Sequence, residues 1–235
     1  EMNYDDCVRL AAKEADETPR GVIVQDTAWD GYEEIPAWIM QGYGTMAMEA
    51  GEQLKAQGCE RPTHIFVQAG VGSLAGAVVG YFANLYADNP PTFVVVEAEA
   101  AACLYKGAAA GDGDIRIVDG DMQTIMAGLA CGEPNTISWD ILKNHVKVFI
   151  AAPDWVAANG MRMLAAPIKG DASITSGESG AAPFGALAAM TTLDEYEQLK
   201  KDIGLDENSR VLLFSTEGDT DPDRYKNIVW KGLDK

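Results

Sequence analysis

Short apolar runs alternate with helical patterns along most of the chain. Five runs are rich in β-branched or aromatic residues and predict strands, at 21–25, 64–68, 93–97, 146–150 and 211–214. Five other segments predict helices, at 3–15, 45–57, 73–86, 154–164 and 193–203, with Thr45 as the expected cap of the second. This alternation indicates an α/β fold of three layers, in which helices flank a mostly parallel sheet.

Composition and charge narrow the class of protein. The 235 residues include 18 basic and 36 acidic side chains, so the formal net charge is −18. A chain this acidic lacks the positive surface that nucleic acids require, and we expect no nucleic-acid partner. No apolar run approaches the length of a membrane span, and the first ten residues lack a secretory pattern. We therefore expect a cytoplasmic protein with no membrane partner. The 34 alanines and 24 glycines would let helices lie close to the sheet.

The positions of the cysteines and histidines indicate no metal-binding or redox motif. The four cysteines form no CxxC pair, so neither a zinc ribbon nor a thioredoxin-type motif is available, and no metal site is expected. His64 opens an apolar run and His145 lies in a polar one. A structural role is the favoured interpretation for both, and a Ser-His-Asp arrangement is left open.

The strongest local signal is the glycine-rich segment after the second predicted strand. Gly70, Gly72 and Gly76 follow the run 64–68 and precede a helical pattern. Glycines here would let backbone N–H groups face one concavity at a helix N-terminus, which suits a phosphate without any lysine. The spacing departs from the GxGxxG dinucleotide fingerprint. A tight turn with close packing is the alternative interpretation.

Two further segments carry polar groups at places where α/β proteins bind ligands. The turn 215–221 follows the last predicted strand and begins with Ser215, whose hydroxyl would suit a ring nitrogen. A capped turn rich in Asp and Gly is the alternative. The segment 176–183 enters a small-residue helix with Glu178 as its one charge. Glu178 is either a buried carboxylate beside a ligand or a favourable acid at a helix start.

In this order, several segments resemble the fold type II pyridoxal-phosphate enzymes. The segment GYGTMAME at 42–49 is similar to the glycine-glycine-threonine segment of that family, and 69–74 to its phosphate loop. Segments 124–129, 178–182 and 215–221 match three further family segments. Within the family, four strings resemble the diaminopropionate ammonia-lyases: QDTAW at 25–29, WIMQGYGT at 38–45, AGLACGEPNT at 127–136 and STEGDTDP at 215–222.

The resemblance implies roles for particular residues. The cofactor would be pyridoxal 5'-phosphate, with its phosphate cradled by Gly70, Val71, Gly72, Ser73 and Leu74, Ser215 at its ring nitrogen and Glu178 beside it. Asp26 matches a family aspartate at the active site and would contact the substrate amine or belong to the base system. The alternative is that Asp26 only caps a turn. The implied reaction is α,β-elimination on 2,3-diaminopropionate, giving pyruvate and ammonia, in a homodimer.

The sequence also departs from this family. None of its eleven lysines lies in the context of the family's Schiff-base lysine, and the family's asparagine loop is missing. We therefore expect a C-terminal portion that is inactive alone, with 1–41 a remnant of the smaller mobile domain and 42–235 the large cofactor-binding domain. Cys103 and Cys131 both flank family segments and are expected near each other, with a disulfide the less common outcome. The alternatives are a non-catalytic phosphate-ligand or subunit-interaction module, or a serine/threonine dehydratase-like enzyme.

Overall fold

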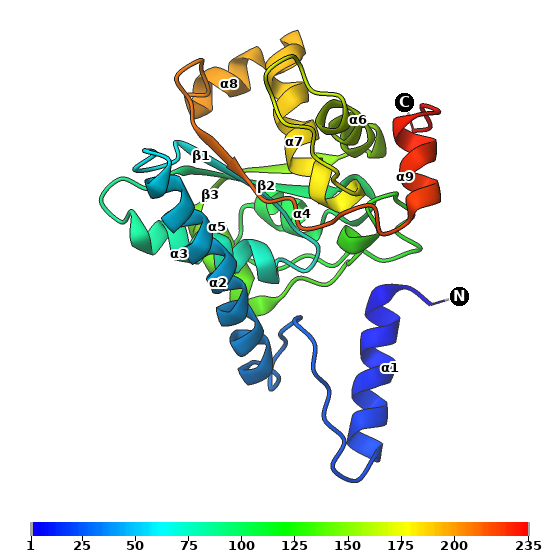
Figure 1. Cartoon of the computed structure of the whole chain (residues 1–235). Helices are drawn as coiled ribbons and strands as arrows, with labels where there is room; N and C mark the ends of the chain where they lie inside the picture. The colour runs from blue at the N-terminus through cyan, green and yellow to red at the C-terminus, as the bar shows by residue number, and fades with distance from the viewer. Residues whose placement is uncertain (1, 235) are drawn as a thin grey trace.

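A parallel four-stranded sheet forms the centre of the protein in a computed structural model that describes residues 2–234 (Figure 1). The strand order is β3-β2-β1-β4, and Phe66 of the central strand β1 pairs with Val94 on one side and Leu213 on the other. The strands are β1 (His64–Gln68), β2 (Thr92–Ala98), β3 (Val146–Ala152) and β4 (Val211–Leu213). The predicted α/β fold with a parallel sheet is therefore confirmed.

Helices cover both faces of this sheet. Figure 1 shows α6, α7 and α8 on one side of the strands and α2, α3 and α5 on the other. The α-helices are α1 (Tyr4–Glu17), α2 (Glu34–Ala56), α3 (Ser73–Leu85), α4 (Cys103–Ala110), α5 (Thr136–His145), α6 (Asp154–Ala165), α7 (Glu178–Thr192), α8 (Glu197–Ile203) and α9 (Pro222–Val229). Short 3₁₀ turns lie at η1 (Glu99–Ala101), η2 (Ala127–Leu129) and η3 (Asp194–Tyr196).

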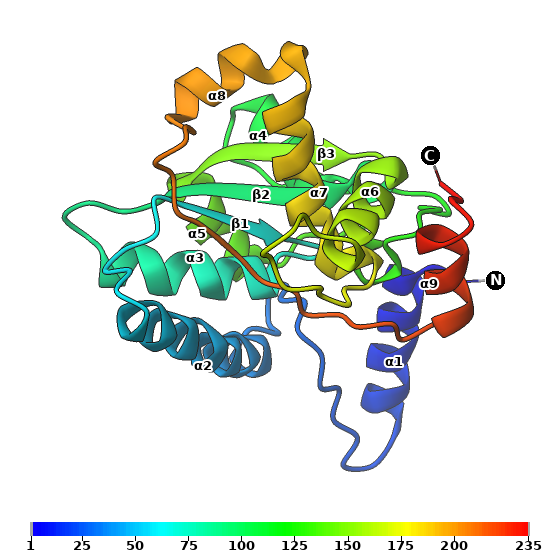
Figure 2. The same ribbon diagram turned by 45° about the horizontal axis from the view of Figure 1, so that its top comes forward.

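Alternate residues of the strands feed two hydrophobic cores. Ile65 and Val67 of β1 pack into a cluster with α3 and α5, whereas Phe66 between them packs into a cluster with α6 and α7. Because helices cover the sheet on both faces, the side chains on both sides of β1 are buried, and a strand in this position is mostly apolar. Figure 2 shows α3 running beneath the strands and α7 crossing in front of them.

Small residues let α6 and α7 approach at backbone distance. A Cβ added at Gly185 would lie 2.0 Å from the carbonyl oxygen of Val156, and one at Gly160 would lie 2.5 Å from the carbonyl oxygen of Ala181. Only glycine fits at either position without displacing the facing backbone. This contact explains part of the chain's high content of small residues.

Two sequence predictions near the N-terminus are wrong. Residues 21–25 form no strand, and Val22 and Val24 are 70% and 69% exposed. An apolar run becomes a strand only beside a hydrogen-bonding neighbour, and no strand of the described chain lies there. Thr45 caps no helix, since α2 already begins at Glu34 and passes through this position. Because α2 also runs through residues 41 and 42, the helix does not break at the predicted domain boundary, and the two-domain division stays a prediction.

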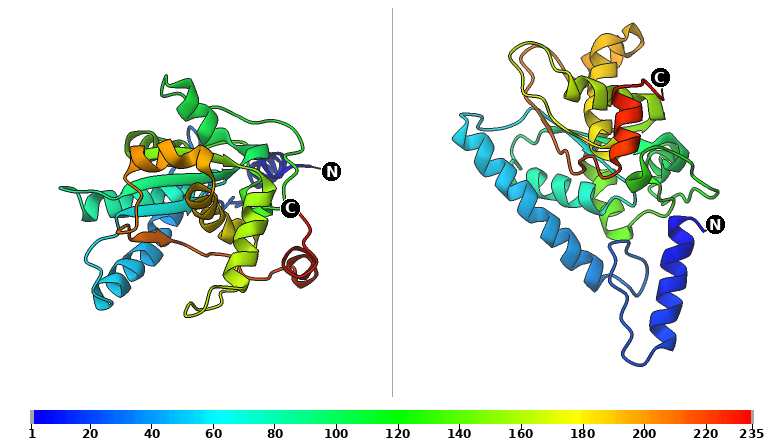
Figure 3. Two further views of the ribbon diagram at one scale, coloured as in Figure 1. Left: turned by 90° about the horizontal axis from the view of Figure 1, so that it is seen from above. Right: turned by 45° about the vertical axis from the view of Figure 1, so that its right-hand side comes forward.

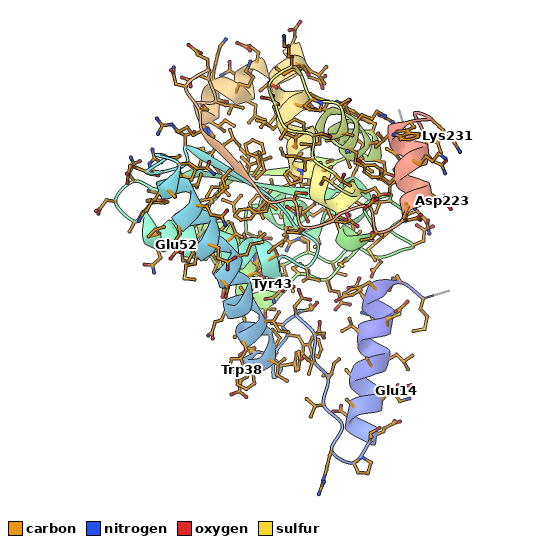
Figure 4. All side chains as sticks on the ribbon, viewed as in Figure 1. Glu14, Trp38, Tyr43, Glu52, Asp223 and Lys231 are labelled. Atoms are coloured by element: carbon orange, nitrogen blue, oxygen red, sulfur yellow. The ribbon has the colours of Figure 1, made fainter. Side chains whose placement is uncertain are left out.

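The first turn of α1 is fastened to the rest of the protein, and its far end projects away. The buried carboxylate of Asp5 accepts a hydrogen bond of 2.9 Å from the backbone N–H of Gly132. Asn3 caps the helix and donates through its amide to the carbonyl of Gly120. Figure 3 shows α1 standing off the body, and Figure 4 places Glu14 on this distant part. The predicted helix at 3–15 is confirmed, and its start lies beside the carboxyl end of the sheet.

The two histidines lie at the ends of elements, His64 at the start of β1 and His145 at the end of α5. His64 is buried, and its Nε2 lies 2.9 Å from the carbonyl oxygen of Ile203, which fits the structural role expected for it. Among residues 2–234, no helix is both long enough and apolar enough to cross a membrane.

Candidate functional site

A cavity of about 360 Å³ opens at the carboxyl ends of β1 and β4. Open α/β sheets bind ligands at this edge, where loops leave neighbouring strands. Segments far apart in sequence line it: Tyr4, Asp26, Tyr43, Gln68 to Leu74, Gly128, Leu129, Cys131, Ser179, Thr216 and Glu217.

The glycine-rich loop forms one wall of the cavity. Gly72 has a φ of +100°, a left-handed conformation that favours glycine, and it is the N-cap of α3. A Cβ at Gly70 would lie 3.2 Å from the carbonyl oxygen of Gly128, so the loop also passes close to η2. The carbonyl of Val71 accepts a 2.8 Å hydrogen bond from the N–H of Asn135, which fixes the loop to the start of α5. The loop is therefore in contact with both α5 and η2.

The N-terminus of α3 gives this wall of the cavity a partial positive charge. Its N-cap makes no side-chain hydrogen bond, and the N–H groups of a first helical turn have no partner within the helix. These groups carry partial positive charge and attract anions. No lysine or arginine is among the residues that line the cavity in the described chain. An anion bound here would depend on backbone N–H groups.

Asp26 enters the same cavity and is tied to the loop. Its backbone carbonyl accepts hydrogen bonds of 2.6 Å from both the Ser73 hydroxyl and the Asn135 side-chain amide. Its carboxylate accepts a longer hydrogen bond of 3.4 Å from the hydroxyl of Tyr43 on α2. Figure 4 labels Tyr43 midway along that helix. Backbone anchoring thus leaves the Asp26 carboxylate facing the cavity.

Two tyrosines stand beside this carboxylate. Burial, followed by the negative charge of Asp26, raises the pKa of Tyr4 to about 12. The same two causes raise the pKa of Tyr43. Both phenols are therefore protonated near neutral pH and can donate hydrogen bonds.

The turn after β4 and the start of α7 form a further wall. The Glu217 carboxylate accepts hydrogen bonds from the N–H groups of Ser179 and Gly180, at 2.6 and 3.4 Å from one oxygen. The Gln68 side-chain amide donates to the Thr216 hydroxyl at 2.8 Å and to the Phe214 carbonyl at 2.9 Å. Two buried atoms, Gln68 Oε1 and Ser179 Oγ, have no hydrogen-bond partner. Such atoms are costly unless a ligand satisfies them.

The structure brings most of the predicted site residues together. Asp26 and the whole loop Gly70–Leu74 line the cavity, whereas Ser215 and Glu178 do not. The Ser215 hydroxyl donates to the Ser176 hydroxyl at 2.8 Å. Glu178 is the first residue of α7, and burial raises its pKa. Ser215 and Glu178 are next to lining residues in sequence, and their contact with a cofactor stays a prediction.

Sequence reasoning assigned no site role to five lining side chains, Tyr4, Tyr43, Gln68, Thr216 and Glu217, although all but Tyr4 lie in or beside segments that it had singled out. Signals existed for four of them, because Tyr43 lies in the family-like segment 42–49, Gln68 ends a strand directly before the glycine loop, and Thr216 and Glu217 follow Ser215 in the turn 215–221. For Tyr4 no local signal was available. It reaches the cavity only because Asp5 fastens α1 to the segment around Gly132.

Cys103 and Cys131 lie near each other, as predicted. The Cys103 thiol donates to the Cys131 carbonyl at 3.7 Å, and both thiols are free and buried. Burial is the main cause that raises the pKa of Cys131 to about 12, and it raises the pKa of Cys103 above its ordinary value too. Both are therefore protonated and unreactive near neutral pH.

Known proteins are similar to this chain in sequence and in fold. Residues 1–216 match the model of the family described as "Pyridoxal-phosphate dependent enzyme". The chain is 53% identical to the diaminopropionate ammonia-lyase of Salmonella typhimurium over 233 residues, which are 99% of this chain and 57% of that protein. Identity to the Escherichia coli K12 enzyme is 49% over 232 residues, again 99% and 57% of the two chains. The chain thus spans little more than half the length of these relatives.

The fold agrees with a solved structure. The Escherichia coli diaminopropionate ammonia-lyase, crystallised with an aminoacrylate-PLP azomethine reaction intermediate, superposes with a TM-score of 0.92 at 46% identity. The match covers 100% of this chain and 58% of that one. Because the family match extends over residues 1–216, well beyond half of the sequence, the chain belongs to the pyridoxal-phosphate dependent enzymes.

Proposed function

We propose that this chain is the C-terminal, cofactor-binding portion of a diaminopropionate ammonia-lyase, and that it holds pyridoxal 5'-phosphate by its phosphate. The observation that carries the proposal is the loop Gly70–Leu74, which leads into the N-terminus of α3 at a cavity with no basic side chain among its lining residues. Backbone N–H groups at a helix start hold phosphates by this chemistry. The relatives at 53% and 49% identity support the choice of family branch.

The residues present fit this cofactor. Gly72 has a left-handed φ of +100°, and a Cβ at Gly70 would be in tight contact, at 3.2 Å, with the carbonyl oxygen of Gly128. The free volume of about 360 Å³ falls in the range of small-molecule sites. Gln68 Oε1 and Ser179 Oγ, both buried and unpartnered, offer hydrogen bonds to the polar atoms of a ligand.

The proposed reaction is α,β-elimination on 2,3-diaminopropionate, giving pyruvate and ammonia. When bound, pyridoxal phosphate supplies the electron sink for removal of the α-proton. The residues of this chain would bind the cofactor and orient the substrate. The loop Gly70–Leu74 would hold the phosphate, and Ser215 and Glu178 are proposed to contact the rest of the cofactor.

Asp26 is the residue we propose to act on the substrate. Its carboxylate faces the cavity and has only the long bond of 3.4 Å from Tyr43, so it remains available to a ligand. A carboxylate in a cavity without lining cations suits the ammonium groups of a diamino acid. Asp26 would hold a substrate amine or move a proton at that carboxylate, and the protonated phenols of Tyr4 and Tyr43 would orient it.

This chain alone is proposed to be inactive. None of the lysines that the structure describes lines the cavity, so none is placed to carry the cofactor as a Schiff base. We further propose that residues 1–41 belong to the smaller domain and 42–235 to the larger, and that the whole enzyme is a cytoplasmic homodimer. A serine/threonine dehydratase-like specificity and a non-catalytic phosphate-binding module are the alternatives.

Titration with pyridoxal phosphate, followed by fluorescence, tests the phosphate assignment. We expect saturable binding by the wild-type chain and about tenfold weaker binding by Gly72→Ala, because alanine is strained at positive φ and the N–H groups would shift. The matched control is Gly111→Ala. Gly111 has a φ of +70° and no neighbour within 4 Å of an added Cβ, and it does not line the cavity. Equal losses in both variants, or no binding by the wild type, would contradict the proposal.

The same chain, supplied with pyridoxal phosphate and 2,3-diaminopropionate, is assayed for pyruvate. We expect none. Pyruvate formation would overturn the proposed inactivity, while binding of pyridoxal phosphate together with no turnover supports both parts of the proposal.

A further inference from the structure

We propose that Glu217 is a positioning residue that fixes the turn after β4 and, through it, the polar wall that faces the cofactor. This inference rests on the proposed function, because it assigns a role within the same cavity. Glu217 received no role of its own from the sequence, although it lies in the turn 215–221, two residues after Ser215.

The side chain and backbone of Glu217 both bind the start of α7. Its carboxylate accepts hydrogen bonds of 2.6 Å from the N–H of Ser179 and 3.4 Å from the N–H of Gly180. Its backbone carbonyl accepts a hydrogen bond of 2.9 Å from the N–H of Gly177. A carboxylate is favourable at a helix N-terminus, where N–H groups have no partner within the helix. Glu217 thus joins two segments about forty residues apart in sequence.

Two glycines make room for this contact. A Cβ at Gly177 would lie 2.4 Å from the carbonyl oxygen of Gly218 and 2.6 Å from Cγ of Glu217. A Cβ at Gly180 would lie 3.1 Å from the Glu217 backbone nitrogen. Neither glycine has a φ in the left-handed region, so close approach is the reason for its small size. The start of α7 is therefore shaped to receive Glu217.

The contact fixes groups that face the cavity. Thr216 precedes Glu217 and accepts the hydrogen bond from Gln68 at 2.8 Å. Ser179, whose N–H binds Glu217, has a buried hydroxyl oxygen with no partner, and so does the side-chain carbonyl of Gln68. All three residues line the cavity together with the phosphate loop. Without Glu217, the turn that carries Thr216 would lose its hydrogen bonds to the start of α7, where Ser179 lies. The loop Gly70–Leu74 would keep its hydrogen bond from Asn135 at the start of α5.

Binding of two different ligands distinguishes a positioning role of Glu217 from a general contribution to the stability of the cavity. We would measure the affinity of the whole chain for inorganic phosphate and for pyridoxal phosphate, together with the circular dichroism that the bound chromophore acquires. In Glu217→Ala we expect the affinity for inorganic phosphate to be unchanged. Pyridoxal phosphate should bind about tenfold more weakly and acquire less circular dichroism, because the hydrogen bonds from Ser179 and Gly180 to the carboxylate are lost. Glu217→Gln keeps an acceptor oxygen and is expected to recover most of both signals.

Two further variants complete the test. Asp206→Ala is the matched control, because Asp206 also accepts a backbone N–H, from Asn208 at 2.9 Å, but does not line the cavity. It should bind both ligands as the wild type does. If Glu217→Ala does not fold, the comparison uses Glu217→Asp, whose shorter side chain should weaken pyridoxal phosphate binding and leave phosphate binding intact.

The outcomes separate the two proposals. Unchanged pyridoxal phosphate affinity and dichroism in Glu217→Ala would overturn the positioning role alone, and so would a parallel loss of phosphate affinity, which indicates collapse of the cavity. A wild-type chain that binds neither ligand would overturn the proposed function itself, and the role of Glu217 with it.

Discussion

The hydroxyl of Ser73 donates a hydrogen bond of 2.6 Å to the backbone carbonyl of Asp26. Ser73 is the first residue of α3, at the end of the proposed phosphate loop, and Asp26 belongs to the connection between α1 and α2. The Asn135 side-chain amide bonds both partners, at 2.9 Å to Ser73 and 2.6 Å to Asp26. The proposed cofactor wall and the proposed substrate contact are therefore held by one small polar network.

Ser73→Ala removes one donor from this network. We expect the free energy of unfolding to fall by about 1 kcal/mol, because the Asp26 carbonyl keeps its bond from Asn135. Urea unfolding followed by tryptophan fluorescence measures this. The control is Ser173→Ala, which removes an exposed hydroxyl that donates to the Ala165 carbonyl and should change stability less. Equal effects of the two variants would show that the network contributes nothing beyond a surface hydrogen bond.

The sheet was predictable because β1 and β2 are buried on both faces and read as continuous apolar runs. The same rule failed at 21–25, since the pattern of Val22 and Val24 does not reveal whether a neighbouring strand exists. Gly42 and Gly44 concealed the first half of α2, although an added Cβ at either would meet nothing within 4 Å. These two glycines did not end the helix, which runs from Glu34 to Ala56.

The part of the site that is formed by residues contiguous in sequence was predictable. The glycine loop is contiguous in sequence, so backbone conformation alone indicated it. Tyr4 and Glu217 reach the cavity through contacts with residues far along the chain, at Gly132 and Ser179, which no local pattern encodes.

Glycine substitutions in two helices should have opposite effects. Gly42→Ala lies in α2 with open space around it and should stabilise the protein by about 1 kcal/mol, from helix propensity. Gly185→Ala would place a Cβ 2.0 Å from the Val156 carbonyl oxygen and should destabilise by about 2 kcal/mol or more, as α6 and α7 move apart. Thermal unfolding compares the two. Destabilisation by Gly42→Ala would mean that this helix face is covered in solution.

The exposed thiol of Cys7 and the two buried thiols should differ in their rates of alkylation. Cys7 is exposed, whereas Cys103 and Cys131 are buried, and burial raises their pKa values. Because the thiolate is the reactive form, we expect Cys7 to be labelled first near pH 8 and the buried pair to be labelled only in denaturant. Peptide mass spectrometry identifies the labelled positions. A linked peptide containing Cys103 and Cys131, persisting in denaturant without reductant, would contradict the free thiols described here.

Glu97, at the end of β2, should make stability depend on pH. Its carboxylate oxygens accept hydrogen bonds of 2.8 and 2.7 Å from the N–H groups of Leu104 and Tyr105 at the start of α4. Burial nevertheless dominates and raises its pKa from 4.5 to about 8. Between these two values the folded state binds the proton more tightly than the unfolded state does. The contribution of Glu97 to stability is therefore present below pH 4.5 and is lost as pH rises toward 8.

We expect the free energy of unfolding to fall with rising pH over this window, with a slope from Glu97 of at most about 1.4 kcal/mol per pH unit. Glu97→Gln should remove that part of the slope, because the amide does not titrate. Glu99→Gln, two residues away and exposed, should leave it unchanged. Urea unfolding of the three proteins at a series of pH values gives the comparison. Identical slopes in the wild type and Glu97→Gln would mean that the Leu104 and Tyr105 hydrogen bonds keep this carboxylate charged despite its burial.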